Sequence, residues 1–194
     1  MNELSYVQST LLADPVYIDV RSPSEYAEDH IPGAHNVPLL DDEQRRIVGT
    51  LYKEEGQDRA RSRGLELIQP ALEDKMAEIR RLGAGGTLVI YCWRGGMRSR
   101  SVASWLEEQG LTAHKLRRGY KEYRRQVVND LDGEMVFAPL FSLYGLTGTG
   151  KTEILDQLNR RGVQVLDLEH FANHRGSAFG AVGLGEQPSQ KTFE

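Results

Sequence analysis

The segment that most limits the possible folds of this chain is a short apolar run, Thr87–Tyr91 (TLVIY). It is too short for a helix with a buried face, and it lacks the polar alternation of a strand that has one face in water. Such runs are typical of strands covered on both faces, as in a parallel sheet. The run follows the turn at Gly83–Gly86 and leads through Cys92 and a glycine-containing loop into a helix expected at Arg98–Gln109. This strand–loop–helix unit predicts an α/β protein.

Other segments before residue 129 repeat the alternation of strands and helices. Further strands are expected at Val16–Val20, His35–Val37 and Ala113–Leu116. Helices are expected to begin at Ser22 and to span Glu66–Leu82 and Tyr120–Val128, whereas residues 41–64 show no clean period and are interpreted as helix and loop. The pattern predicts a mainly parallel sheet with helices on both faces.

The composition is that of a globular protein, with 39% hydrophobic and 27% charged residues. No apolar run approaches the ~20 residues that a membrane-spanning helix needs. The N-terminal residues lack the basic start and apolar stretch of a secretory signal, so we expect a cytoplasmic protein with no membrane partner. A single cysteine excludes an intramolecular disulfide framework and a cysteine-based zinc site, and we expect no metal centre.

A second α/β pattern follows a stretch that is typical of a linker. A strand at Leu140–Tyr144, a glycine-rich loop, a helix at Glu153–Arg161 and a strand at Val163–Leu166 are expected. The pattern divides the chain into a first domain over 5–128, a linker over 129–139 and a second domain over 140–194. The last range is shorter than a domain of ordinary size, so we expect only the N-terminal part of that domain.

The loop at Gly145–Thr152 fits the pattern G-x4-G-K-[ST] of phosphate-binding P-loops. Backbone N–H groups would surround phosphates, Lys151 would reach the terminal oxygens, and Thr152 would ligate Mg²⁺ if it is present. The predicted phosphate-binding residues are Gly145, Gly148, Gly150, Lys151 and Thr152. Asp167 and Glu169 follow the next expected strand, where an acid either serves the magnesium site or caps a helix.

Cys92 stands between the buried strand and the helix, in the segment Cys92–Ser99 (CWRGGMRS). Loop amides and a helix N-terminus form a positively polarised concavity there, which favours a thiolate. Cys92 is therefore the candidate catalytic residue; the alternative is a buried structural cysteine. The candidate anion-binding residues are Trp93, Arg94, Gly95, Gly96, Met97 and Arg98.

The segments Asp19–Tyr26 (DVRSPSEY) and His30–Pro38 (HIPGAHNVP), together with the cysteine loop, resemble rhodanese domains. The resemblance implies that Cys92 takes up sulfur or selenium and passes it on. It also implies that Asp19, Arg21 and His35 brace the loop. The C-x5-R spacing is instead that of Cys-dependent phosphatases, but no general acid is evident, and we regard a phosphatase as the weaker interpretation.

The combination of a rhodanese domain, the CWRGGMRS loop, the segment Leu116–Tyr120 and a P-loop resembles the family of bacterial tRNA 2-selenouridine synthases. The resemblance implies replacement of sulfur by selenium in wobble 2-thiouridine of tRNA, with selenophosphate as donor. It further implies a geranylated intermediate made from geranyl diphosphate, and no tightly bound cofactor. Arg94 and Arg98 would bind selenophosphate, and the P-loop would hold a diphosphate.

Residues 44–129 hold 18 basic and 10 acidic residues, although the whole chain is acidic. Such a region suits an RNA partner, and a solvated helical face is the alternative. The predicted tRNA-binding residues are Arg117, Arg118, Lys121, Arg124 and Arg125. Two other functions remain open: a sulfurtransferase or phosphatase for small molecules with a regulatory ATP site, and a non-catalytic tRNA-binding module.

Overall fold

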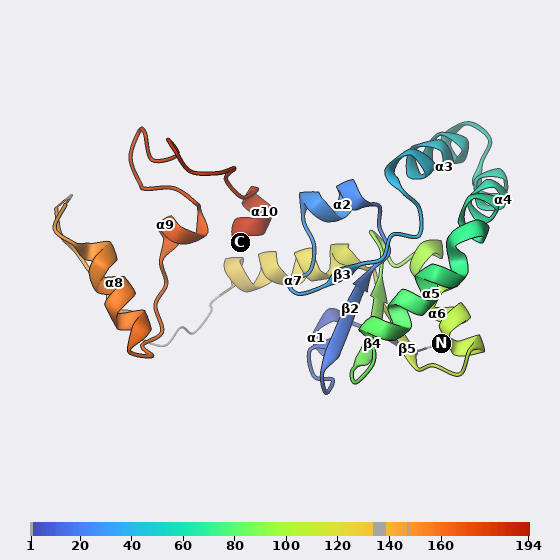
Figure 1. The fold of residues 1–194 in the computed structure, drawn as a ribbon, viewed down its shortest axis with the longest axis horizontal. Helices are drawn as coiled ribbons and strands as arrows, with labels where there is room; N and C mark the ends of the chain where they lie inside the picture. The colour runs from blue at the N-terminus through green and yellow to red at the C-terminus, as the bar shows by residue number, and fades with distance from the viewer. Residues whose placement is uncertain (1, 134–138, 147) are drawn as a thin grey trace. The chain divides into compact units, whose positions relative to one another are not determined.

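The structure, a computed structural model, describes residues 2–133, 139–146 and 148–194 (Figure 1). The chain divides into two compact units, a first unit over residues 1–133 and a second unit over residues 134–194. Each unit is described by itself below.

The first unit is built on a five-stranded sheet with the order β1-β5-β4-β2-β3, in which all pairs are parallel. The strands are β1 (Asn2–Leu4), β2 (Pro15–Asp19), β3 (His35–Asn36), β4 (Thr87–Tyr91) and β5 (Ala113–Leu116). The predicted parallel sheet is confirmed. Sequence analysis missed β1, because this short edge strand joins β5 through its backbone and has no apolar pattern of its own.

Side chains of β4 alternate between two buried clusters, one on each face of the sheet. Leu88, Ile90 and Cys92 enter the cluster formed with α5 (Leu72–Leu82) and α6 (Met97–Glu108). Val89 and Tyr91 enter the other cluster, with α7 (Tyr120–Asp132) and the edge of α1 (Tyr6–Ser9). Figure 1 shows these helices on either side of the strands. Burial on both faces explains the continuous apolar sequence of β4.

Residues 41–68 form a helical hairpin, α3 (Asp42–Glu54) and α4 (Gln57–Ile68). Asp41 begins α3 because its side chain accepts the amide of Gln44 in a capping box. The single helix expected over Glu66–Leu82 is wrong. Pro70 cannot donate a helical hydrogen bond, and a 3₁₀ turn at Gln69–Ala71 separates α4 from α5.

Two boundaries also differ from the sequence expectation. Helix α2 (Pro23–Glu28) follows Ser22 as expected, but α7 continues to Asp132, so the first four residues assigned to the linker are helical. Residues 134–138 of the expected linker lie outside the described residues.

The second unit contains three helices among its described residues, α8 (Lys151–Arg160), α9 (Leu168–Phe171) and α10 (Gln190–Phe193). The strands expected at Leu140–Tyr144 and Val163–Leu166 are wrong, because both segments are irregular in the structure. Strands need neighbours for their backbone hydrogen bonds, and the described part of this unit supplies none. Gly180 is its single buried residue among those described.

Candidate functional site

Cys92 follows the last residue of β4, and the loop after it leads directly into α6. Its side chain is 3% exposed, and its Sγ lies 3.3 Å from the Ser99 hydroxyl in the first turn of α6. Ser99 can therefore donate a hydrogen bond to a thiolate. Helix α6 begins after Gly96, which has no side chain to cap it, so the first-turn amides face the loop as donors for an anion.

Two glycines make this loop possible. Gly95 has φ +62°, and a Cβ there would lie 2.8 Å from the Leu116 carbonyl oxygen. Gly119 has φ +57°, and a Cβ there would overlap the Cys92 carbonyl oxygen and the Gly95 amide. Lys115, which is buried, fixes the same loop by donating to the Gly95 carbonyl oxygen at 2.8 Å. The loop is thus held by β5 and by the segment after it.

The sulfur lies at a cleft of about 830 Å³ that opens between the loop and α3. The loop residues Trp93, Arg94, Gly96, Met97 and Arg98 line the cleft together with Cys92, as do Arg45, Arg46 and Lys53 of α3. Gly95, which belongs to the same loop, is buried and does not line the cleft. Sequence analysis missed the contribution of α3, since nothing in its irregular charge pattern links it to Cys92.

The two arginines predicted to bind an anion differ in their surroundings. Arg94 is exposed and makes no ion pair within the described part of the chain. Arg98 forms a bidentate ion pair with Glu25 of α2, with N···O distances of 2.7 and 3.3 Å. Burial by itself raises the pKa of Glu25, but Arg98 and the Ser22 amide outweigh it, and the net pKa is lowered. Glu25 therefore remains a carboxylate that holds Arg98.

Asp19 and Arg21 form a buried ion pair next to the loop, and the guanidinium carbon of Arg21 lies 5.9 Å from the centroid of the Trp93 ring. The Arg21 guanidinium donates to both Asp19 oxygens, with a shortest distance of 2.7 Å, and also to the Asp29 carbonyl oxygen. Tyr120 donates to the Asp29 carboxylate and stacks on Trp93, with ring centroids 5.3 Å apart. This network connects β2, α7 and the loop.

The expectation that His35 braces the loop is wrong. His35 is exposed and makes no side-chain hydrogen bond among the described residues. The next residue on edge strand β3, Asn36, points to the opposite face and donates to the carbonyl oxygens of Asp19 and Arg21, at 3.0 Å each.

The predicted tRNA-binding segment lies against the cysteine loop. The backbone amides of Tyr120 and Lys121 donate to the carbonyl oxygens of Cys92 and Trp93, at 2.9 and 3.2 Å. Arg117, Arg118 and Lys121 are exposed, and no ion pair engages them among the residues described. Arg125 is paired with Glu122 at 2.9 Å, and Arg124 is partly buried. Three of the five predicted cations are thus available to an RNA phosphate.

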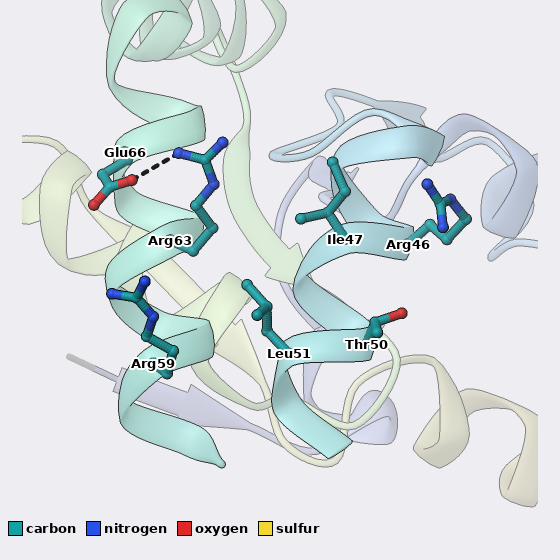
Figure 2. A pocket seen from close by; sticks show the side chains of 7 residues that line it. All are labelled: Arg46, Ile47, Thr50, Leu51, Arg59, Arg63 and Glu66. Atoms are coloured by element: carbon teal, nitrogen blue, oxygen red, sulfur yellow. Dashed lines mark hydrogen bonds and ion pairs between the residues drawn. The ribbon is translucent and has the colours of Figure 1, made fainter. Parts of the chain in front are cut away.

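A further basic hollow, of about 430 Å³, lies between α3 and α4. Figure 2 shows Ile47 and Leu51 of α3 directed toward α4, with Arg59 and Arg63 on the α4 side. Its arginines are already paired, Arg63 with Glu66 at 2.8 Å among them. The hollow therefore offers no unpaired arginine to a ligand.

In the second unit, the predicted P-loop precedes α8. Gly148 and Gly150 both have φ +78°, and Gly150 is the N-cap of the helix. Lys151 donates from Nζ to the carbonyl oxygens of Gly145 and Leu146, at 2.9 and 2.8 Å. Thr152 is exposed, and Thr147 lies outside the described residues.

Asp167 caps α9 by accepting the His170 amide at 3.0 Å, which favours the structural role for this acid. The residues described contain no cluster of His, Cys, Asp and Glu suited to a metal ion. Among the described residues, no helix combines the length and the apolar character that crossing a membrane requires.

Comparison with known proteins identifies the first unit. The rhodanese-like domain model matches residues 5–126, which is more than half of the chain. The chain belongs to the rhodanese-like domain family. A second family model, described as the tRNA 2-selenouridine synthase AAA domain, matches residues 138–194.

Several curated relatives of this rhodanese-like chain are named tRNA 2-selenouridine synthase. The protein from Pseudomonas syringae pv. tomato is 39% identical over 96% of this chain and 50% of that protein. Those from Shewanella sp. (strain MR-7) and Pseudomonas entomophila are 37% and 40% identical over 94% and 96% of this chain, covering 49% and 50% of those proteins. The chain spans about half the length of the curated relatives it matches. The sequence resemblance to this family is confirmed.

A solved structure also resembles the rhodanese-like unit. It is an N-terminal domain from Clostridium difficile 630, belonging to a protein described as ATP/GTP-binding. The TM-score is 0.63 at 36% sequence identity, over 64% of this chain and 98% of that chain. This likeness supports the α/β fold of the first unit.

Proposed function

We propose that this chain is part of a tRNA 2-selenouridine synthase, in which Cys92 carries selenium on its way to wobble 2-thiouridine of tRNA. One observation carries the proposal: the amides of Tyr120 and Lys121 bind the carbonyl oxygens of Cys92 and Trp93. Those two bonds attach the start of α7, and with it the basic segment that begins at Arg117, to the cysteine loop. A tRNA whose phosphates contact Arg117 and Arg118 would present its bases near the sulfur. Because the proposed substrate is tRNA, we also propose that the enzyme acts in the cytoplasm.

Selenophosphate is the proposed donor. Its phosphate would be bound by the loop amides and by the exposed Arg94, with Arg98 contributing after it leaves Glu25. Ser99, 3.3 Å from the sulfur, would stabilise the anionic forms of the carrier by donating a hydrogen bond. The cleft beside the loop gives both donor and base access to the sulfur.

The atoms and electrons of the loading step define its products. The Cys92 thiolate attacks selenium, an S–Se bond forms, and the Se–P bond breaks with its electron pair remaining on phosphorus. The products are a Cys92–S–Se⁻ anion and phosphite. In delivery, the terminal selenide attacks C2 of the S-geranylated base, a C–Se bond forms, and the C–S bond breaks to release geranyl thiolate. A thiol reductant then supplies the two electrons that cleave the S–Se bond, which leaves selenium on the base and returns the Cys92 thiolate.

The P-loop is proposed to bind the diphosphate of geranyl diphosphate, which would supply the geranyl group of a geranylated thiouridine intermediate. Gly145, Gly148, Gly150 and Lys151 would surround the phosphates, with Thr152 as the Mg²⁺ ligand if magnesium takes part. Lys151 now binds loop carbonyl oxygens and would turn to the phosphates. The measurable consequence is that geranyl diphosphate binds to this chain and that Lys151→Ala weakens binding.

The test of the carrier is to incubate the chain with selenophosphate, digest it and weigh the Cys92 peptide, while ³¹P NMR follows the phosphorus product. We expect a selenium adduct on Cys92 together with phosphite, and neither with Cys92→Ser. A folded chain that gives no adduct, or a Cys92→Ser variant that forms selenouridine normally, would overturn the carrier role. Tight tRNA binding without any adduct would favour a binding module instead.

The tRNA contact has its own test. The double variant Arg117→Glu/Arg118→Glu should weaken tRNA binding and reduce the salt slope of the binding constant by about 2. The matched control is Arg80→Glu/Arg81→Glu on α5, which reverses two arginines outside the proposed contact. Equal effects of the two variants would contradict a specific tRNA contact by the segment.

A small-molecule sulfurtransferase is the second candidate, because the rhodanese-like fold and a cysteine at a cleft suit it equally well. Turnover of thiosulfate and cyanide by this chain, without selenium uptake, would favour it. A phosphatase stays the weaker interpretation, because the sequence shows no evident general acid for it.

A further inference from the structure

An apolar groove of about 490 Å³ lies beside the Cys92 cleft, between α3, α4 and α6. Its buried floor is formed by Leu39, Leu40 and Ile68, which belong to the main core cluster. Of the residues that line this groove, Met97 and Arg98 at its edge were assigned above to selenophosphate binding. The other lining residues have been given no role in binding selenophosphate, a diphosphate or tRNA.

The walls of the groove expose apolar side chains to water. Tyr52 is 56% exposed, Leu65 is 45% exposed and Met97 is 40% exposed, and all three line the groove from different helices. Apolar side chains that converge on a hollow from separate elements mark a binding surface. A ligand that covers them gains the free energy of removing this surface from water.

The groove and the Cys92 cleft are continuous. Five residues line both of them: Leu40, Val48, Tyr52, Met97 and Arg98. A ligand in the groove can therefore extend past Met97 to the cleft where the sulfur lies. The site suits a molecule with an apolar chain at one end and a reacting group at the other.

The rim of the groove is basic. Arg61 of α4 and Arg100 of α6 line it, both are exposed, and neither takes part in an ion pair within the described residues. An apolar floor with an arginine rim complements an apolar chain attached to an anionic group, such as a nucleotide of an RNA.

We propose that this groove binds the hydrocarbon chain of an S-alkylated thiouridine while its base reaches Cys92 and the neighbouring RNA phosphates face Arg61 and Arg100. This assignment rests on the proposed function, in which the alkyl group is geranyl. It gives the rhodanese-like unit a role in selecting the alkylated substrate, because a chain bound in the groove holds the reacting carbon near the sulfur.

Gly64 provides a way to fill the groove. It lies in α4, lines the groove and is buried, and a Cβ there would contact Val48 at 3.8 Å without a clash. A leucine at this position would extend beyond that contact into the space for the chain. Leu65→Gln, at an exposed wall position, makes the wall polar with less risk to folding.

The experiment measures the affinity of the chain for three short anticodon stem-loop RNAs that carry 2-thiouridine, S-methyl-2-thiouridine or S-geranyl-2-thiouridine. Wild type should bind the geranylated RNA about tenfold more tightly than the unalkylated one, with the methylated RNA close to the latter. Gly64→Leu and Leu65→Gln should lose most of this preference. Val128→Gln, which replaces an exposed apolar residue of α7 outside the groove, should retain it.

Equal affinity of wild type for the three RNAs, or an unchanged preference in both groove variants, would overturn the groove assignment. A wild-type dimer that dissociates in Leu65→Gln, detected by light scattering, would also overturn it by making the groove an interface between two copies. Selenium loading of Cys92 in wild type is measured separately. A retained geranyl preference without loading would overturn the carrier role and leave the groove assignment standing.

Discussion

Two apolar runs of equal length, each followed by a glycine-rich loop and a helix, adopt different structures in this molecule. Thr87–Tyr91 becomes strand β4 at the centre of the sheet, whereas Leu140–Tyr144 is irregular, with Phe141 98% exposed and Tyr144 96% exposed. The first run lies between β2 and β5, which pair with its backbone on both sides. The second run has no such neighbour among the described residues.

The loops after the two runs differ in the same way. The cysteine loop is held by groups distant in sequence, including Lys115 and the segment around Gly119. The P-loop is instead held by contacts within its own segment, where Lys151 donates to two carbonyl oxygens of the loop. Local sequence creates both loops, but only tertiary contacts make one of them a rigid site.

The largest difference in stability between the two units is expected when one partner of a buried ion pair is neutralised. Asp19→Asn should lower the free energy of unfolding of the first unit by about 3–5 kcal/mol, because it leaves the buried guanidinium of Arg21 without its counter-ion. Asp156→Asn is the matched variant in the second unit, where the carboxylate makes an exposed ion pair with Arg160, and it should change stability by less than about 1 kcal/mol. Denaturant unfolding measures both; similar losses would contradict the comparison.

The next largest difference in stability between the two units is expected when a core side chain is truncated. Ile90→Ala removes a fully buried side chain of β4 and should lower the free energy of unfolding by about 2–5 kcal/mol. Leu166→Ala removes an exposed side chain of the second unit and should stay within about 0.5 kcal/mol. Thermal melting followed by circular dichroism reports the shift, and a large effect of Leu166→Ala would show that this unit has a core.

A glycine exchange tests the loop contact. Gly119→Ala combines a positive φ with overlap of the Cys92 carbonyl oxygen and should cost about 2–4 kcal/mol. Gly162→Ala in the second unit also has a positive φ, +79°, but its Cβ meets no atom within 4 Å, so only about 1–2 kcal/mol is expected. Chemical denaturation measures the difference. Equal stability losses for the two variants would mean that the cysteine loop shifts to make room for the methyl group.

The smallest effect is a pH dependence within the first unit. The lowered pKa of Glu25 means that its ion pair stabilises the fold above pH 4.5, the ordinary value, and that this contribution disappears as the pH falls through the folded-state pKa. Glu25→Gln should therefore lower stability at pH 7 by less than about 1 kcal/mol, and the loss should be smaller at pH 3. Urea titrations at the two pH values check this, and a variant equally destabilised at both would contradict it.

Much of the first unit could be predicted from its sequence. The strand over Thr87–Tyr91, the placement of Cys92 before a helix and the pair Asp19–Arg21 all have local signals or a specific resemblance. Glu25 could not be recognised as the partner of Arg98, because the two residues lie 73 positions apart in the chain. His35 does not brace the loop, and its neighbour Asn36 instead donates to carbonyl oxygens at the end of β2, because the register of an edge strand decides which face each residue occupies.

The sequence by itself determined the order of helices and strands in residues 15–36 and 87–132, the cysteine loop and the P-loop, because apolar runs, glycines and caps act over a few residues. Only the tertiary structure decided which apolar run became a strand, because backbone hydrogen bonds of a sheet come from distant segments. It also placed α3 at the cleft, paired Arg98 with Glu25 and opened the groove beside Met97. These features depend on which faces pack together, and packing is a property of the folded chain.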